Sequence, residues 1–443
     1  MSFFLTSFIS PLMKLFRFLL AALMMTSSWT AVAQTFKAPE GKQIYIPNDL
    51  KDNDFSNPDS KWSFARMAYT DDIVVFWEKE FGNDLSKAPA LEGHDMTVDI
   101  DNLLQKLEHF YQFYKNELKF VLPGSKSEKY RMMVMLNYSL EGTAYGGDYD
   151  GQIGALWIAP NRVKDKTLNC IAHELGHSFQ SQIMADGTGE AWGGGGIFEM
   201  TSQWMLWNVN PNWVTDENYH WKGFIEHFNK RFLDGENIYH SPYVLEYWSF
   251  KHGLTVMGDL FRAGKRGEDP ALTYMRVFNL SLEQMADEMY DCYSRLLTFD
   301  FPRVKESHKK YACQLLTQPV KKQDGKQMVL TPADGKYPEQ YGFNIFELPM
   351  DKKSMKLTFS GKEGENVGFR YGVVLVNDNM EPTYFPFYKD IKKSFKVKKA
   401  KDTTRAFFVV VGCPTNNYER MSWGRRNQNQ DKQTTYEYTL TVK

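Results

Sequence analysis

The chain has 443 residues, of which 42% are hydrophobic and 24% are charged. This composition is typical of a globular protein with a substantial core, and the length suits two to three domains. The formal net charge is −1, so no overall basic field favours nucleic acid as a partner.

The first 33 residues are predicted to be a secretory signal peptide. Lys14 and Arg17 form a positive region, an apolar stretch follows at 18–25, and Ala31-Val32-Ala33 matches an A-x-A cleavage site. The apolar stretch is too short for a membrane span, and no later segment reaches about 18 apolar residues. We therefore expect a secreted, periplasmic or extracellular protein with no membrane span in the mature chain.

Four cysteines are spread along the chain, at positions 170, 292, 313 and 413. None forms a C-x-x-C pair, so a thiolate zinc site is not expected. Export would permit disulfides. Cys292 and Cys313, which flank a short segment, could then pair, and four buried thiols are the alternative.

The N-terminal half has the pattern of an α+β domain. Residues 34–70 are polar and predict an extended N-terminal segment before a domain at 71–320. Amphipathic spacing predicts a helix over 97–119, and apolar runs predict strands over 72–78, 130–136 and 153–158.

A glycine-rich segment and an apolar strand come directly before the central motif. The glycine-rich stretch 146–151 is predicted to be a turn-rich loop. The strand at 153–158 directly precedes the next helix. It is therefore the predicted edge strand, where a peptide substrate could add as another strand.

A helix predicted over 165–184 carries the sequence His-Glu-Leu-Gly-His at 173–177. His173 and His177 are four residues apart, so both imidazoles project from one face and can bind one Zn²⁺. Glu174 lies beside that position and suits a general base acting on a metal-activated water. Two hydrogen-bonded histidines in a buried helix are the alternative interpretation.

The other side of this helix predicts a packing face. An apolar ladder repeats every four residues, at Ile171, Leu175, Phe179 and Ile183. The histidines lie about 200° around the helix from it, which indicates a helix between a core and a cleft. Gly176 costs about 1 kcal/mol relative to Ala in a helix interior, and a close neighbour against the helix would explain it.

A catalytic zinc needs a third protein ligand and one open position. The metzincin pattern requires a histidine where Ile183 stands, which excludes that class. Glu199 begins a helix predicted over 197–207 and is the favoured third ligand, because the glycine-rich loop before it would let this helix fold back. Glu190 in that loop is the rival, and a solvated helix N-terminal carboxylate is the alternative for Glu199.

His-Glu-Leu-Gly-His followed by a helical glutamate resembles the gluzincin branch of the zincin metallopeptidases, over roughly residues 70–300. The resemblance implies zinc ligation by His173, His177 and Glu199, with Glu174 as the base. Gluzincins often carry Asn before the ligand glutamate, whereas Phe198 stands here.

The chain is more closely similar to an uncharacterised family of secreted Bacteroidota proteins that carry a C-terminal β domain. Three sequence stretches support this resemblance: Phe76 to Gly82, Gly154 to Trp157, and His173 to Gln180.

Peptide hydrolysis also needs a donor that stabilises the oxyanion, and in gluzincins a Tyr or His supplies it. Candidates are Tyr239, His240, Tyr243 and His220. His240 and Tyr243, around a proline-fixed turn, are the favoured pair, although packing would explain each of them. His252 is interpreted as a core or capping histidine.

After about residue 320 the pattern changes to that of an all-β unit. Alternation recurs at 354–359, 395–397 and 436–442, and near-continuous apolar runs lie at 371–376 and 406–411. We predict a separate β-sandwich over 330–443. It is a candidate for glycan contact or for packing.

Three hypotheses follow. The first is a secreted zinc endopeptidase that hydrolyses extracellular protein or glycoprotein with a water activated by Glu174. The second is a non-catalytic glycan- or surface-binding protein on a zincin scaffold, motivated by the β unit and the 15% aromatic content. The third is a structural zinc without catalysis, which would require a fourth protein ligand.

Overall fold

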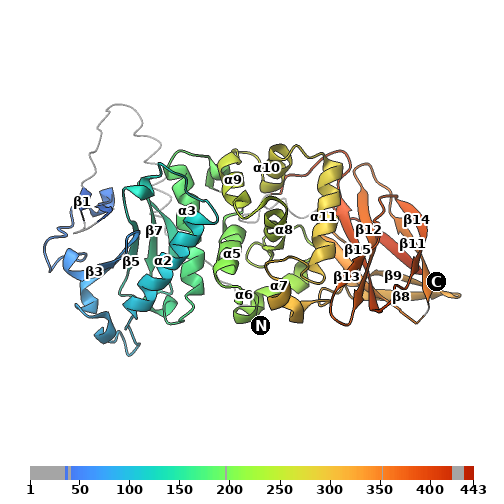
Figure 1. Cartoon of the computed structure of the whole chain (residues 1–443), viewed down its shortest axis with the longest axis horizontal. Coiled ribbons are helices and arrows are strands. Elements are labelled where there is room, and N and C mark those ends of the chain that lie inside the picture. The colour runs from blue at the N-terminus through green and yellow to red at the C-terminus, as the bar shows by residue number, and fades with distance from the viewer. Residues whose placement is uncertain (1–34, 38–40, 195–196, 352, 422–433) are drawn as a thin grey trace.

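The computed structural model describes residues 35–37, 41–194, 197–351, 353–421 and 434–443, so the predicted signal peptide lies outside the described residues. Along its longest axis the molecule runs from an N-terminal sheet with helices, through a helical layer, to two C-terminal sheets (Figure 1). The α+β class is confirmed. In the described parts of the chain, no helix has the length and apolar character needed to cross a membrane.

The N-terminal sheet has five strands, and its three central strands are parallel. β4 and β5 are buried along their whole length, as expected for parallel strands covered on both faces. A two-stranded antiparallel pair, β1 (Thr35–Lys37) and β2 (Gln43–Tyr45), precedes this sheet. In spatial order the strands are β3 (Met67–Tyr69), β4 (Ile73–Trp77), β5 (Met132–Leu136), β7 (Ile153–Ile158) and β6 (Ala144–Tyr149).

The prediction that residues 153–158 form the edge strand is wrong. β7 has these bounds, but it lies between β5 and β6. Much of the stretch predicted as a glycine-rich loop is the edge strand β6 itself. A Cβ at Gly146 would lie 1.8 Å from the Glu174 carbonyl oxygen. Glycine therefore lets β6 approach the next helix closely.

Two helices of 17 residues lie beside this sheet, α2 (Ile100–Asn116) and α3 (Asn169–Ala185). The predicted apolar ladder of α3 is confirmed, because all four of its side chains are fully buried. The Phe179 ring lies edge-on to Tyr111 and Tyr114 of α2. The Tyr114 hydroxyl donates to the Ala172 carbonyl at 3.0 Å. These contacts bury the apolar face of α3 against α2.

The helix α5 (Phe198–Val209) packs across α3, after the short α4 (Ala191–Gly194). A Cβ at Gly176 would lie 2.8 Å from Ser202 Oγ and 3.3 Å from Met205 Sδ. The close neighbour expected at Gly176 is therefore α5.

The remaining helices form the central layer. Five tryptophans of this layer and of α5 are among the largest fully buried side chains of the described chain, so much of the aromatic content serves packing: those at 204, 207, 213, 221 and 248. The helices are α6 (Trp213–Asp216), α7 (Asn218–His227), α8 (Tyr243–His252), α9 (Val256–Ala263), α10 (Pro270–Val277), α11 (Leu282–Leu296) and α12 (Lys305–His308).

The C-terminal strands form a four-stranded and a five-stranded antiparallel sheet. In spatial order the first is β10 (Phe343–Leu348), β15 (Thr403–Cys413), β12 (Gly368–Asn377) and β13 (Pro382–Tyr384). The second is β14 (Lys392–Lys398), β11 (Ser354–Gly361), β16 (Tyr438–Val442), β9 (Gln327–Pro332) and β8 (Pro319–Asp324). Side chains of both sheets share one hydrophobic cluster, in which Phe359 stacks on Tyr371 at 3.8 Å.

The four-stranded sheet also packs against the helical layer through its other face. Phe343 stacks on Tyr293 of α11 at 3.9 Å, and Arg370 forms an ion pair with Asp287. This burial on both faces explains the near-continuous apolar runs of β12 and β15. All four cysteines are free thiols, so the pairing of Cys292 with Cys313 does not form.

Candidate metal centre

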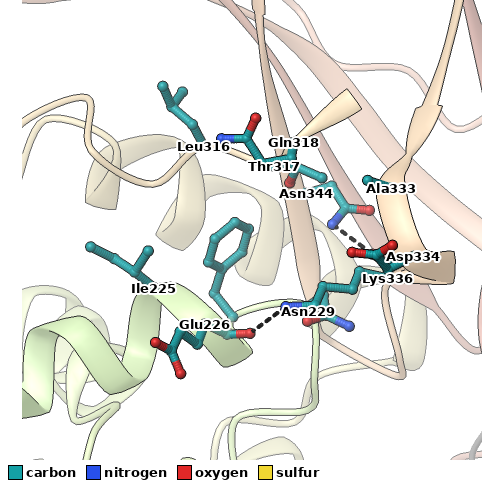
Figure 2. Close-up of a pocket in the computed structure, with 11 residues that line it drawn as sticks. Ile225, Glu226, Asn229, Leu316, Thr317, Gln318, Ala333, Asp334, Lys336 and Asn344 are labelled. Carbon is teal, nitrogen blue, oxygen red and sulfur yellow. Dashed lines mark hydrogen bonds between the residues drawn. The ribbon is translucent and has the colours of Figure 1, made fainter. Parts of the chain in front are cut away.

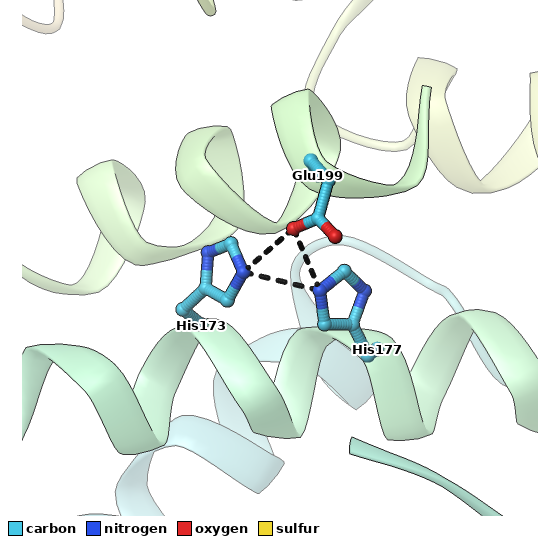
Figure 3. A group of neighbouring side chains, drawn as sticks. All are labelled: His173, His177 and Glu199. Atoms are coloured by element: carbon cyan, nitrogen blue, oxygen red, sulfur yellow. Dashed lines mark hydrogen bonds and ion pairs between the residues drawn. The ribbon is translucent and has the colours of Figure 1, made fainter. Parts of the chain in front are cut away.

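Helices α3 and α5 bring three candidate ligand atoms to one point (Figure 3). Nε2 of His173, Nε2 of His177 and Oε2 of Glu199 lie 3.1 Å from one another. A tetrahedral zinc with bonds of about 2.0–2.1 Å would separate its ligand atoms by roughly 3.3–3.4 Å. The triangle therefore approximates one face of a zinc tetrahedron.

The electrostatics of this triangle favour a cation at its centre. Burial raises the pKa of the Glu199 carboxyl, but hydrogen bonds from His173 and His177 outweigh burial and hold that pKa well below its usual value. For His177, burial lowers the pKa, while the Glu199 carboxylate raises it more and leaves it above normal. A carboxylate oxygen that lies this close to two imidazole nitrogens can share a metal ion with them.

Glu174 faces the same cavity from α3. Burial raises the pKa of its carboxyl, against the lowering effect of His173 and His177. The Gly146 amide of β6 donates to Glu174 Oε2 at 2.8 Å, which fixes the carboxylate beside the triangle. A carboxylate whose pKa is raised by burial suits a general base.

The cavity around these groups has a volume of about 540 Å³. Its walls come from the edge strand β6, from α3 beyond His177, from Phe198 and from Tyr239. Tyr239 is 41% exposed, and its ring stacks on His173 with centroids 6.2 Å apart. Burial and the nearby Glu199 carboxylate raise the pKa of its hydroxyl, so Tyr239 stays a proton donor at neutral pH.

Comparison with known proteins identifies the family. A protein-family model with the description "Family of unknown function (DUF6055)" matches residues 36–443. The chain belongs to this family. No curated protein matches the sequence significantly.

Three solved structures resemble this family member, all from Clostridium perfringens ZmpB. The ZmpB metallopeptidase is 15% identical with a TM-score of 0.30, covering 81% of this chain and 69% of that one. The structure of the CBM32-1, CBM32-2 and M60 catalytic domains is 16% identical with a TM-score of 0.31, and the match covers 79% of this chain and 35% of that one. The structure of the M60 catalytic domain with CBM51-1 and CBM51-2 is 10% identical with a TM-score of 0.30, and the match covers 86% of this chain and 59% of that one. Because these TM-scores are low, the chemistry of the site rests on its own residues.

The two residues favoured from sequence as oxyanion donors do not line the cavity. Tyr243 begins α8 and is buried in the aromatic core, against Trp221 and Phe224. His240 Nδ1 lies 2.7 Å from His220 Nδ1, and burial together with the neighbouring histidines lowers the pKa of His240 to about 4. Tyr239, weighed in the same segment, is the candidate that reaches the cavity.

The other acidic and imidazole candidates have separate partners. Glu190 accepts a hydrogen bond from the Arg266 amide at 3.0 Å, so it turns toward the α9–α10 connection. His252 lies 2.8 Å from the Tyr274 hydroxyl and stacks on Phe278, consistent with packing. Among the residues that the structure describes, no fourth His, Cys, Asp or Glu joins the triangle, which leaves room for a non-protein ligand.

A second cavity of about 210 Å³ lies between the end of α7 and the C-terminal strands (Figure 2). Its lining combines Ile225 and Leu316 with polar groups such as Asn344, whose side chain donates to the Lys336 carbonyl. None of its lining residues belongs to the metal-ligand group. We therefore assign it no part in the chemistry.

Proposed function

We propose that this protein is an exported zinc-dependent endopeptidase acting on protein or glycoprotein substrates. Its zinc ligands would be His173, His177 and Glu199, on a zincin-like domain spanning residues 71–320. The observation that carries the proposal is the 3.1 Å triangle of two imidazole nitrogens and one carboxylate oxygen, beside the carboxylate of Glu174 in one cavity.

Zinc would supply Lewis acidity, which polarises a peptide carbonyl and makes water a nucleophile at neutral pH. Glu174 accepts the proton of that water and later passes it to the leaving amine. Its raised pKa suits both transfers, because proton transfer is most efficient near the working pH. Tyr239 is positioned to donate to the developing oxyanion, the role first assigned to His240 or Tyr243.

The position of β6 at the cavity suits an extended peptide substrate. β6 is the edge strand of the sheet, so an extended peptide can pair with its free backbone groups.

The remaining parts of the proposal concern the rest of the chain. Residues 1–33 would direct export. The β-sandwich predicted over 330–443 would begin earlier, at Pro319, because β8 and β9 belong to its five-stranded sheet. The sandwich is supported by the hydrophobic cluster that the two C-terminal sheets share. It would serve as a packing or substrate-contact module.

The decisive test pairs metal analysis with a peptide-mixture cleavage screen on the mature chain, comparing wild type with Glu174→Gln. We expect about one zinc per chain in both proteins. Cleavage should fall by about 10²–10⁴-fold in the variant, because only the base is lost. Wild type without stoichiometric zinc, or a variant that cleaves as well as wild type, would refute the proposal.

The alternative is a non-catalytic glycan- or surface-binding protein on the same scaffold. It is favoured by Tyr145 of β6, which is 60% exposed at the cavity and could stack on a sugar ring. Glycan affinity that survives Glu174→Gln, with no turnover of any peptide by wild type, would support this alternative.

A further inference from the structure

In each candidate histidine ligand, the ring nitrogen that faces away from the triangle, Nδ1, contacts a glutamine side chain. His177 Nδ1 lies 2.9 Å from Gln180 Oε1, and His173 Nδ1 lies 3.3 Å from Gln203 Oε1. Both glutamines are buried, with 0% and 4% exposure. Gln180 belongs to α3 and Gln203 to α5, so each ligand-bearing helix contributes one of the pair.

The orientation of each amide is fixed by a main-chain carbonyl, which can only accept. Gln180 Nε2 donates to the Phe198 carbonyl at 2.9 Å, and Gln203 Nε2 donates to the Tyr239 carbonyl at 3.3 Å. In both side chains the NH₂ group must therefore face the carbonyl. The amide oxygen is left facing the histidine, where it accepts a hydrogen bond from Nδ1.

This arrangement determines the tautomer of both rings. An imidazole whose Nδ1 donates to an amide oxygen carries its proton on Nδ1 in the neutral form, and its Nε2 then presents a lone pair. Both Nε2 atoms point at Glu199 Oε2, 3.1 Å away. With Nδ1 engaged by an amide oxygen, Nε2 is the ring nitrogen that is left to bind a metal.

We propose that Gln180 and Gln203 are paired positioning residues that lock His173 and His177 in the metal-binding tautomer. The inference rests on the proposed zinc centre. The two glutamines also connect the ligand histidines to the cavity wall. The carbonyls that anchor their amides belong to Phe198, directly before Glu199, and to Tyr239, and both residues line the cavity. A shift of either segment would disturb both amides and, through them, the ligands.

The two histidines differ in how many hydrogen-bond acceptors lie near Nδ1. His177 Nδ1 has a second partner, Ser202 Oγ at 3.2 Å. For His173 Nδ1, Gln203 Oε1 is the one acceptor that the described hydrogen bonds include. The Gln203 amide also lies 3.1 Å from His220 Nε2, so a buried histidine supports its position. Loss of Gln203 should therefore affect zinc binding more than loss of Gln180.

The experiment measures the zinc dissociation constant by chelator competition for wild type, Gln180→Met, Gln203→Met and Gln203→Glu. Methionine keeps an unbranched side chain of similar size without the acceptor. Loss of a partner that orients a ligand typically weakens metal binding about 10- to 100-fold. We expect a loss in this range for Gln203→Met, a smaller loss for Gln180→Met, and recovery in Gln203→Glu, whose carboxylate still accepts from Nδ1.

Gln182→Met is the matched control. Gln182 is equally buried on α3, but its amide oxygen accepts from the Gly154 amide and does not contact a ligand. This variant should lose stability while keeping zinc affinity and the visible spectrum of the Co²⁺-substituted protein. The Gln203→Met protein should show an altered Co²⁺ spectrum, because the ligand ring is no longer oriented.

Two outcomes would overturn the lock. One is wild-type zinc affinity and Co²⁺ spectrum in Gln203→Met, and the other is an equal loss of affinity in Gln182→Met. Because the readout is metal binding, a wild type that binds zinc but cleaves no peptide contradicts the proposed function and leaves the lock standing. A wild type that binds no zinc contradicts both.

Discussion

The helices α3 and α5 supply ligands to the same point by different physical means. On α3, the spacing of four residues aligns His173 and His177 along one face whatever surrounds the helix. On α5, Glu199 reaches the point because α5 packs against α3, and Gly176 leaves room for that close approach. The first pair of ligands is therefore a local property, and the third is a property of helix packing.

The largest expected effect tests whether the two histidines of α3 keep their geometry when the packing of that helix is weakened. Phe179→Ala removes a fully buried ring that packs on Tyr111 and Tyr114, and should lower the free energy of unfolding by about 3–5 kcal/mol. Zinc affinity of the folded protein should stay near wild type, because the histidine spacing is unchanged. Urea unfolding and chelator competition measure the two quantities, and a large fall in zinc affinity would contradict the comparison.

A smaller substitution tests the packing half. Gly176→Ala should strengthen α3 alone by about 1 kcal/mol, yet its Cβ would meet Ser202 Oγ at 2.8 Å. We expect a net destabilisation of about 1–3 kcal/mol from overpacking, together with weaker zinc binding as Glu199 moves away.

The double variant Gly176→Ala/Ser202→Gly is the corresponding rescue, with Ser202→Gly alone as its reference. Removing the hydroxyl should restore part of the lost zinc affinity. If Gly176→Ala binds zinc as tightly as wild type, α5 is not held by this contact, and the distinction between the two helices fails.

The smallest expected effect, taken per pH unit, is a pH dependence that acts on α5. Trp207 of α5 donates to His308 Nε2 at 3.1 Å, and burial lowers the pKa of His308 to about 4. The unfolded chain protonates this group at about 6.5, so between these pH values the unfolded state binds more protons. Stability is therefore fully present above about pH 6.5 and falls as the pH is lowered toward 4, by at most about 1.4 kcal/mol per pH unit.

Urea unfolding at several pH values measures this slope, and His308→Gln, which cannot titrate, should flatten it. An unchanged slope in the variant would show that other groups carry the acid sensitivity.

Local patterns predicted much of the site, and tertiary pairing accounts for the errors. The bounds of β7 were predicted correctly, but its place in the sheet depends on pairing with β6, whose glycines resemble a loop. Tyr239 and His240 are adjacent in an irregular segment without periodicity, so the sequence could not choose which one enters the cavity. Gln203 was missed because its contact with His173 arises only where α3 meets α5. Gln180 lies three residues after His177 on the same helix, so its spacing was a local signal that the sequence contained.

The four-stranded C-terminal sheet has a consequence for how this protein can be divided. One face of the sheet packs on the second sheet and the other on α11, where Phe343 covers Tyr293. A chain ending before Pro319 would expose this apolar side of α11 to water, and the remaining part would be prone to aggregation. The two C-terminal sheets are therefore needed to bury this side of α11. A relative without them would need another element to cover that helix.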